Sequence, residues 1–182
     1  MSCSYDSING ETVFDIKFNE DIEMSGYFKA HLYVSSDSHN DMDMFFTIQK
    51  LDENEKWLPT SVLGEEHPGA WGKIRVSHRE LDPELSTDFQ PVMAHRSEKK
   101  LNPGEIVPID VEFYPHSRFW HKGQQLRLRI AGRYIREGWF EPFSWETDNK
   151  GEHIIHTGGK YDSYLQIPVI PPKYQAGDYI YR

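Results

Sequence analysis

Adjacent serine and histidine residues could carry acyl-transfer chemistry. Two such pairs are Ser77-His78 and His116-Ser117, but neighbouring side chains of a strand point to opposite faces of a sheet. The G-x-S-x-G motif that presents the nucleophile of many hydrolases does not occur in the sequence. The residues therefore predict no self-contained catalytic triad, and we assign no catalytic residue.

Two groups of side chains could be considered as metal ligands. The run from Asp37 to Asp43 is rich in oxygen ligands of the kind that calcium prefers, but it lacks the glycine and terminal glutamate of an EF-hand loop. We favour a solvated turn that leads into a core strand. His153 and His156 have the spacing H-x-x-H, but a strand would direct them to opposite faces, which favours structural or interfacial roles. We predict no metal and no cofactor.

The segment YIREGWFEPFSW holds five aromatic residues among turn residues, Tyr134, Trp139, Phe140 and Trp145 among them. Loops lie at the surface, so some of these rings should be exposed or covered by a partner. The segment could stack against sugar rings, dock a second domain, or fold back over one end of the core.

The elements that position these residues are predicted to be strands, because apolar residues alternate with polar ones in seven rows. Phe45 interrupts one row on its opposite face, and Pro108 and Pro168 indicate edge strands or bulges. One short helix is expected from Asp82 to Phe89. The rows are Phe14–Phe18, Phe28–Val34, Met42–Ile48, Ile74–Val76, Val107–Phe113, Leu126–Ile130 and Leu165–Val169.

These features predict an all-β fold. We expect residues 1–182 to form a single antiparallel jelly-roll β-sandwich, similar to galactose-binding domains, with about eight or nine strands and one short helix.

Composition narrows the possible partners. The 182 residues carry a net charge of -9 and a pI near 5.4, which argues against nucleic acids and anionic membranes. No signal peptide or transmembrane segment is visible. With Cys3 as the single cysteine, a reducing compartment, the cytoplasm, is the expected location.

Five motifs in order resemble the C-terminal β-sandwich domain of the cocaine-esterase-like (CocE/NonD) hydrolases, a family that includes X-Pro dipeptidyl-peptidases. Nearly the whole chain takes part in the resemblance. The matching segments are Ser4–Asp6 with Glu23–Tyr27, Leu32–Phe46, Gly72–Asp82, Leu101–Gly132 and His156–Pro171.

The resemblance implies a non-catalytic domain that packs on an α/β-hydrolase domain, in the same parent chain or in trans, and helps to shape its substrate pocket. The parent would be an acyl esterase or an X-Pro dipeptidyl-peptidase whose triad lies outside this chain, so whether this chain counts as an enzyme is left open. The chain could be a separately expressed piece, a shortened gene model or a stand-alone relative, and a truncated parent is the most economical account. A stand-alone carbohydrate-binding or interaction module is the alternative.

The resemblance also makes two regions candidates for the hydrolase-facing surface. One is Trp71 with the triplet Ser77, His78 and Arg79, although an internal polar network is an equal interpretation of His78 and Arg79. The other is the aromatic segment. His153 and His156 are further interface or ligand-facing candidates. A large apolar interface left uncovered predicts self-association of the isolated chain.

Overall fold

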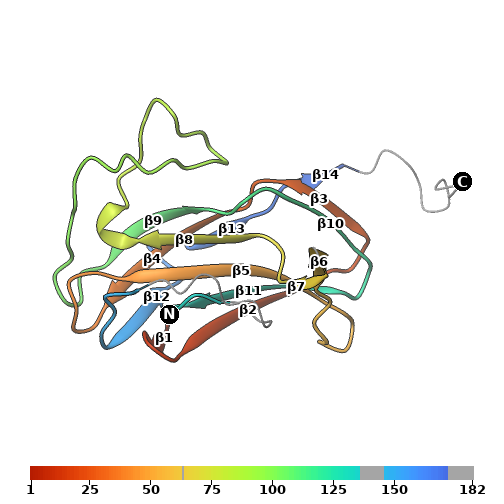
Figure 1. The fold of residues 1–182 in the computed structure, drawn as a ribbon, viewed down its shortest axis with the longest axis horizontal. Helices are drawn as coiled ribbons and strands as arrows, with labels where there is room; N and C mark the ends of the chain where they lie inside the picture. Colours follow the sequence, from red (N-terminus) through yellow and green to blue (C-terminus); the bar gives the residue numbers. More distant parts are fainter. Residues whose placement is uncertain (63, 136–145, 172–182) are drawn as a thin grey trace, which may run out of the picture.

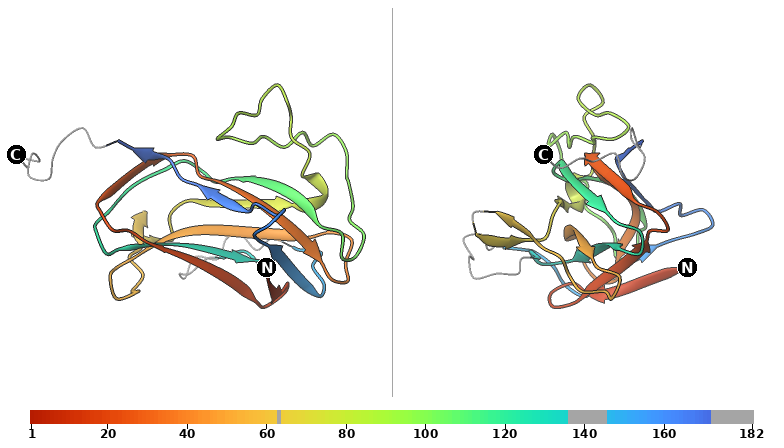
Figure 2. Two further views of the ribbon diagram at one scale, coloured as in Figure 1. Left: turned by 180° about the vertical axis from the view of Figure 1, so that it is seen from behind. Right: turned by 90° about the vertical axis from the view of Figure 1, so that its right-hand side faces the viewer.

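The computed structural model describes residues 1–62, 64–135 and 146–171, and these form fourteen strands and one 3₁₀ helix. The strands run lengthwise along the molecule (Figure 1), and the connection between η1 and β9 projects beyond the sheets (Figures 1 and 2). The elements are β1 (Ser2–Asp6), β2 (Glu11–Lys17), β3 (Ile22–Gly26), β4 (Lys29–Ser36), β5 (Asp43–Leu51), β6 (Thr60–Val62), β7 (Glu65–His67), β8 (Trp71–Arg75), η1 (Val76–His78), β9 (Val107–Glu112), β10 (His116–Trp120), β11 (Gln125–Ala131), β12 (Glu152–His156), β13 (Tyr164–Gln166) and β14 (Val169–Ile170).

Every strand pairing among the described residues is antiparallel. In sheet A, β1 pairs with β12, and β12 and β13 pair with successive parts of β4 along one of its edges. Strand β9 pairs with the other edge of β4. Sheet B has the order β2-β11-β5-β8. A three-stranded sheet, β10-β3-β14, and the hairpin β6-β7 complete the fold. The all-β antiparallel prediction is confirmed. The jelly-roll assignment stays a prediction.

The core lies between sheets A and B, where alternating side chains face inward. Ala30, Leu32 and Val34 of β4 are buried, and the polar residues between them face away from the core, as period-two patterning requires. Met44, Phe46 and Ile48 of β5 belong to the same core. All seven predicted rows overlap strands, although Val76, the last residue of one row, lies in η1. The total exceeds the expected eight or nine partly because β6, β7, β13 and β14 have only two or three residues each.

The predicted helix from Asp82 to Phe89 is wrong. Asp82 Oδ1 accepts the N–H groups of Glu84 and Leu85 at 2.9 and 3.2 Å, which forms a turn. The chain then leaves the helical path, because the Ser86 hydroxyl accepts the N–H of Val92 at 3.0 Å. Within the described residues the helical element is η1, which contains Ser77 and His78. The expectation that this pair lies on a strand was therefore also wrong.

Strands β9 and β2 both lie at edges of their sheets. Pro108 lies in β9, which pairs only with β4 in the described topology, so the edge prediction is confirmed. In the row Phe14–Phe18, Phe18 is buried, but Phe14 and Ile16 are 37% and 43% exposed. These two side chains lie opposite Leu128 and Leu126, on the core-facing side of the sheet, but β2 is an edge strand. No helix in the described ranges is long and apolar enough to cross a membrane.

Candidate functional site

Four aromatic side chains, Phe45, Trp71, Tyr114 and Tyr134, form a continuous cluster beside β5 and β8, here called the aromatic cluster. The ring centroids of Trp71 and Tyr114 lie 4.6 Å apart, and that of Tyr134 lies 6.3 Å from Trp71 and 6.1 Å from Phe45. Phe45 is buried, whereas Tyr114 is 60% exposed. The cluster is therefore anchored in the fold at one end and presents an aromatic ring to solvent at the other.

The backbone fixes the position of this cluster. Trp71 opens β8 opposite Thr47 of β5, and its carbonyl accepts the N–H of Tyr114 at 2.9 Å. At Gly72, a Cβ atom would lie 2.4 Å from the carbonyl oxygen of Glu112, so glycine permits a close approach between β8 and β9. The structure thus brings together two predicted residues, Trp71 and Tyr134. Sequence reasoning noted Phe45 only as an interruption of its row and missed Tyr114.

The other end of β8 is charged. Arg75 donates two hydrogen bonds to the carboxylate of Asp43, at 2.7 and 2.8 Å, and these bonds raise the pKa of the guanidinium. The backbone N–H of Asp148 donates to the same carboxylate at 3.0 Å. This paired geometry neutralises Asp43 beside the aromatic cluster.

Asn149 organises the same region and was not singled out from the sequence. Its side chain is buried. It accepts the N–H of Asp43 at 2.8 Å and donates to the carbonyls of Asp43 and Gly132 at 3.0 and 2.6 Å. One amide therefore ties the start of β5 to the segments that follow β11 and precede β12. No local pattern reveals such a residue, since its partners are 17 and 106 positions away.

Ser77, His78 and Arg79 lie at the end of β8 opposite to Trp71. Ser77 is fully buried, and its backbone N–H donates to Asp41 Oδ1 at 2.9 Å. Arg79 donates to the carbonyl of Lys99, and His78 is partly buried. These contacts hold η1 against the strands and the long connection, which agrees with an internal polar network.

Asp41 is the centre of that network. Its burial opposes ionisation, but bonds from the Lys100 ammonium at 2.8 Å and from the N–H groups of Ser77 and Met42 outweigh it, so the pKa of Asp41 stays below its usual value. The carboxylate is therefore a structural anchor with both oxygens engaged.

The two histidines of the H-x-x-H spacing point to opposite faces of β12, as expected. His153 is fully buried, and Tyr5 Oη lies 3.1 Å from its Nδ1. Burial lowers the pKa of His153 to about 4. His156 lies on the outer face of sheet A, where its Nε2 is 2.9 Å from the hydroxyl of Ser35.

The oxygen-rich run before β5 has its carboxylates in separate networks. Asp37 accepts the N–H of Glu152 at 2.8 Å and the hydroxyl of Ser38 at 2.7 Å, whereas Asp41 and Asp43 bind Lys100 and Arg75. No group of three or more histidine, cysteine or acidic side chains within the described ranges could hold a metal ion.

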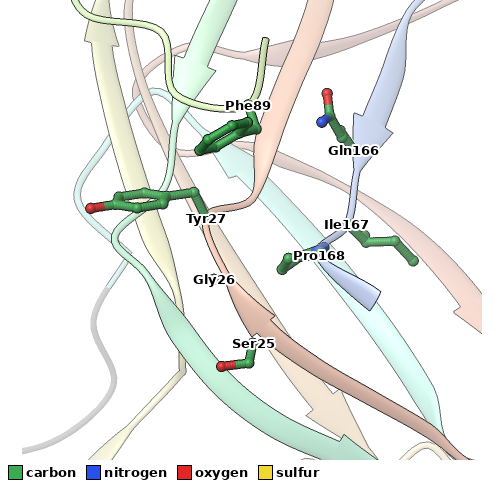
Figure 3. Close-up of a pocket in the computed structure, with 7 residues that line it drawn as sticks. All are labelled: Ser25, Gly26, Tyr27, Phe89, Gln166, Ile167 and Pro168. Atoms are coloured by element: carbon green, nitrogen blue, oxygen red, sulfur yellow. The ribbon is translucent and has the colours of Figure 1, made fainter. Parts of the chain in front are cut away.

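A shallow groove of about 290 Å³ lies where the long connection meets β3 and β13. Figure 3 shows the ring of Phe89 beside that of Tyr27. Lys29 Nζ donates to the carbonyl of Asp88 at 2.5 Å, which holds the connection in this position. The groove is mainly apolar and was not predicted from the sequence. Its lining residues are Ser25, Gly26, Tyr27, Phe89, Gln166, Ile167 and Pro168.

Three predicted residues of the aromatic segment, Trp139, Phe140 and Trp145, lie outside the described residues. Tyr134 is the aromatic residue of that segment whose position is described.

The model of a protein family matches most of the chain. It is the X-Pro dipeptidyl-peptidase C-terminal non-catalytic domain, and it covers residues 6–166. The chain belongs to this family. The family resemblance that the sequence motifs indicated is thereby confirmed. No curated protein gives a significant match.

Solved structures give the same assignment. Two crystal structures of a CocE/NonD family hydrolase from Staphylococcus aureus match with a TM-score of 0.89 and 37% identity, over 93% and 94% of this chain. The match covers 33% of the S. aureus protein, so this chain spans about a third of its length.

Two more distant structures share the fold. An alpha-amino acid ester hydrolase matches at 13% identity and a TM-score of 0.60, over 88% of this chain and 25% of its own. An aminopeptidase from a marine sediment Thaumarchaeota archaeon matches at 15% identity and a TM-score of 0.58, over 88% of this chain and 26% of its own.

Proposed function

We propose that this chain is the non-catalytic C-terminal domain of a serine hydrolase of the acyl esterase or X-Pro dipeptidyl-peptidase class. It would pack on the α/β-hydrolase domain of that enzyme and help to shape the substrate pocket. The observation that carries the proposal is the family match over residues 6–166. The S. aureus relative, three times as long at 37% identity, supports it. The triad and oxyanion donors would come from the hydrolase domain. The free Cys3 agrees with the cytoplasm as the proposed location.

The aromatic cluster is the proposed docking face for the hydrolase domain. Tryptophan and tyrosine dominate the energetic centres of protein interfaces, and Trp71 lies between the exposed Tyr114 and the inner ring of Tyr134. Arg75 and Asp43 flank the cluster as a closed ion pair, so a partner that covers these two residues would bury paired charges. In this proposal Ser77, His78 and Arg79 hold the neighbouring connection in place.

A chimaera tests this proposal. The C-terminal third of the S. aureus hydrolase is replaced by this chain, and ester hydrolysis and thermal unfolding are measured. We expect a folded, active chimaera in which Trp71→Ala lowers the melting temperature of the hydrolase part and reduces kcat/KM. Phe119→Ala removes an exposed ring of β10 and should change neither. Equal behaviour of the two variants would contradict docking through the cluster.

Carbohydrate binding is a second candidate function, favoured by the outer face of sheet A. Tyr164 stacks on His31 with 5.2 Å between ring centroids, and Tyr33 contacts both His31 and Tyr161. Asp110, 3.0 Å from His31 Nδ1, is a hydrogen-bonding group of the kind that sugars need. Electrophoresis through gels that contain xylan, galactomannan or β-glucan tests this function. Retardation that Tyr164→Ala abolishes would support it, and unchanged mobility in all three gels would reject it.

A further inference from the structure

Strand β2 is an exposed edge of sheet B. It pairs with β11 on one side and ends the strand order of that sheet. Its seven residues, ETVFDIK, include no proline or glycine, and those from Val13 to Lys17 are exposed. Natural proteins usually protect such edges, because the unpaired backbone groups can accept another strand.

The side chains of β2 continue the core face beyond the sheet. Phe14 lies opposite Leu128 and Ile16 lies opposite Leu126. Residues opposite each other in an antiparallel pair point to the same face, and both leucines are buried in the core. Phe14 and Ile16 are therefore core-side residues that the fold of one copy leaves 37% and 43% exposed.

The sequence of β2 is complementary to itself when reversed. In an antiparallel pair centred on Phe14, the two copies of Phe14 meet, Thr12 meets Ile16, and Glu11 meets Lys17 at both ends. Opposite charges directly across a strand pair stabilise it. Glu11 and Lys17 share the outer face with Val13 and Asp15, which also meet each other. On this face Arg129 donates to the Glu11 carboxylate at 2.9 Å, and Arg127 donates two bonds to the Asp15 carboxylate, at 2.8 and 2.7 Å.

The neighbouring registers are worse. A register that keeps the two core faces on one side of the joined sheet must shift by two residues. Either shift leaves two of the seven residues of each strand unpaired and separates Glu11 from Lys17, whereas the register centred on Phe14 pairs all seven residues. The length of β2 and its oppositely charged ends thus select the register centred on Phe14.

We propose that two copies of this chain associate through antiparallel β2–β2 pairing, which joins their B sheets and covers Phe14 and Ile16. The partner is a second copy because the complementarity is between β2 and itself. The aromatic cluster lies beside β8, at the opposite edge of sheet B, so this inference does not rest on the proposed docking to a hydrolase domain.

Sedimentation velocity of the 182-residue chain, from about 1 to about 200 µM, tests the association itself. We expect a species of about 43 kDa, twice the 21.4 kDa of the chain, whose share grows with concentration. A single 21.4 kDa species over the whole range would overturn the proposal.

Cysteine cross-linking tests the register in a Cys3→Ser background. The two copies of residue 14 should have Cα atoms about 5 Å apart, so Phe14→Cys is expected to form an intermolecular disulfide under mild oxidation. Ile16→Cys is the matched control, because the two copies of residue 16 would be offset by four residues, about 13 Å. Ile16→Cys should cross-link only when mixed with Thr12→Cys.

The cross-linking pattern decides between registers. Efficient cross-linking of Phe14→Cys alone and of the Thr12→Cys and Ile16→Cys mixture supports the proposal. Cross-linking of Ile16→Cys alone that equals or exceeds that of Phe14→Cys would overturn it, even if the chain sediments as a dimer.

Discussion

The buried His153 should make the stability of this domain fall in mildly acidic solution. The imidazole is fully buried, its Nδ1 lies 3.1 Å from the hydroxyl of Tyr5, and their rings meet edge to face with 5.4 Å between centroids. Burial disfavours the charged imidazolium and lowers the pKa of His153 to about 4. An unfolded histidine titrates near 6.5.

The sign and size of the effect follow from this difference. As the pH falls from 6.5 towards 4, the unfolded chain binds a proton that the folded chain does not, so the free energy of unfolding decreases. The contribution is fully present above pH 6.5 and is lost by about pH 4, where the loss reaches about 3 kcal/mol. Between about pH 7.5 and 4.5 the expected loss from His153 alone is about 2.5 kcal/mol. Burial also lowers the pKa of His116 and of His156, and these act in the same direction.

Urea unfolding at a series of pH values, compared between the wild type and His153→Gln, isolates the contribution of this residue. The variant should be less stable at neutral pH, because it loses the contacts with Tyr5, but its stability should decline less steeply between about pH 7.5 and 4.5. His121→Gln is the control: that side chain is 66% exposed, and its replacement should change the slope much less than His153→Gln does. Parallel declines for the wild type and His153→Gln would refute the assignment of a buried, uncharged His153.

Three more substitutions test the packing around the candidate site, each by urea or thermal unfolding. Asn149→Asp replaces the amide N–H that donates to the carbonyl of Asp43 with a second acceptor oxygen, and it should lower the free energy of unfolding by about 3 kcal/mol. A decrease no larger than that for an exposed asparagine would show that Asn149 does not hold these segments together. Gly72→Ala places a Cβ 2.4 Å from the carbonyl oxygen of Glu112. It should lower the free energy of unfolding by about 1 to 3 kcal/mol and the melting temperature by several degrees. An unchanged melting temperature would show that β8 and β9 can separate freely. Asp41→Asn should lower the free energy of unfolding at neutral pH by about 2 kcal/mol. Because the pKa of Asp41 is lowered in the folded chain, its carboxylate stabilises the fold at higher pH and loses this effect on protonation. The stability of the variant should therefore fall less steeply below about pH 4.

Period-two patterning predicted the strands well, because it reflects a constraint that every residue of a half-buried strand obeys. Leu126, Leu128 and Ile130 are buried as the alternation required. Pro108 marked an edge strand because proline has no N–H to donate to a second neighbour. The five family motifs added what periodicity lacks, namely the domain type.

Features that depend on distant contacts escaped the sequence. The expected helix after Asp82 failed because Ser86 binds the backbone of Val92. Phe14 and Ile16 have the right period for a core, but only the strand order shows that they lie at an edge.

The candidate site was half predicted. Trp71 and Tyr134 stood out as aromatic residues in turn-rich segments, but their contact depends on the pairing of β8 with β5 and of β5 with β11. Tyr114 escaped notice because it follows a regular strand, and its role depends on the position of Trp71.

The central claim, that this domain acts as part of a serine hydrolase, is tested most directly in extract of the source organism. An antibody against the domain is used for immunoblotting and immunoprecipitation, together with labelling by a serine-reactive fluorophosphonate. We predict either one labelled species about three times the 21.4 kDa of this chain, the ratio seen in the S. aureus relative, or a 21.4 kDa species that co-precipitates with a labelled hydrolase. A 21.4 kDa species that precipitates with no labelled protein would contradict the account.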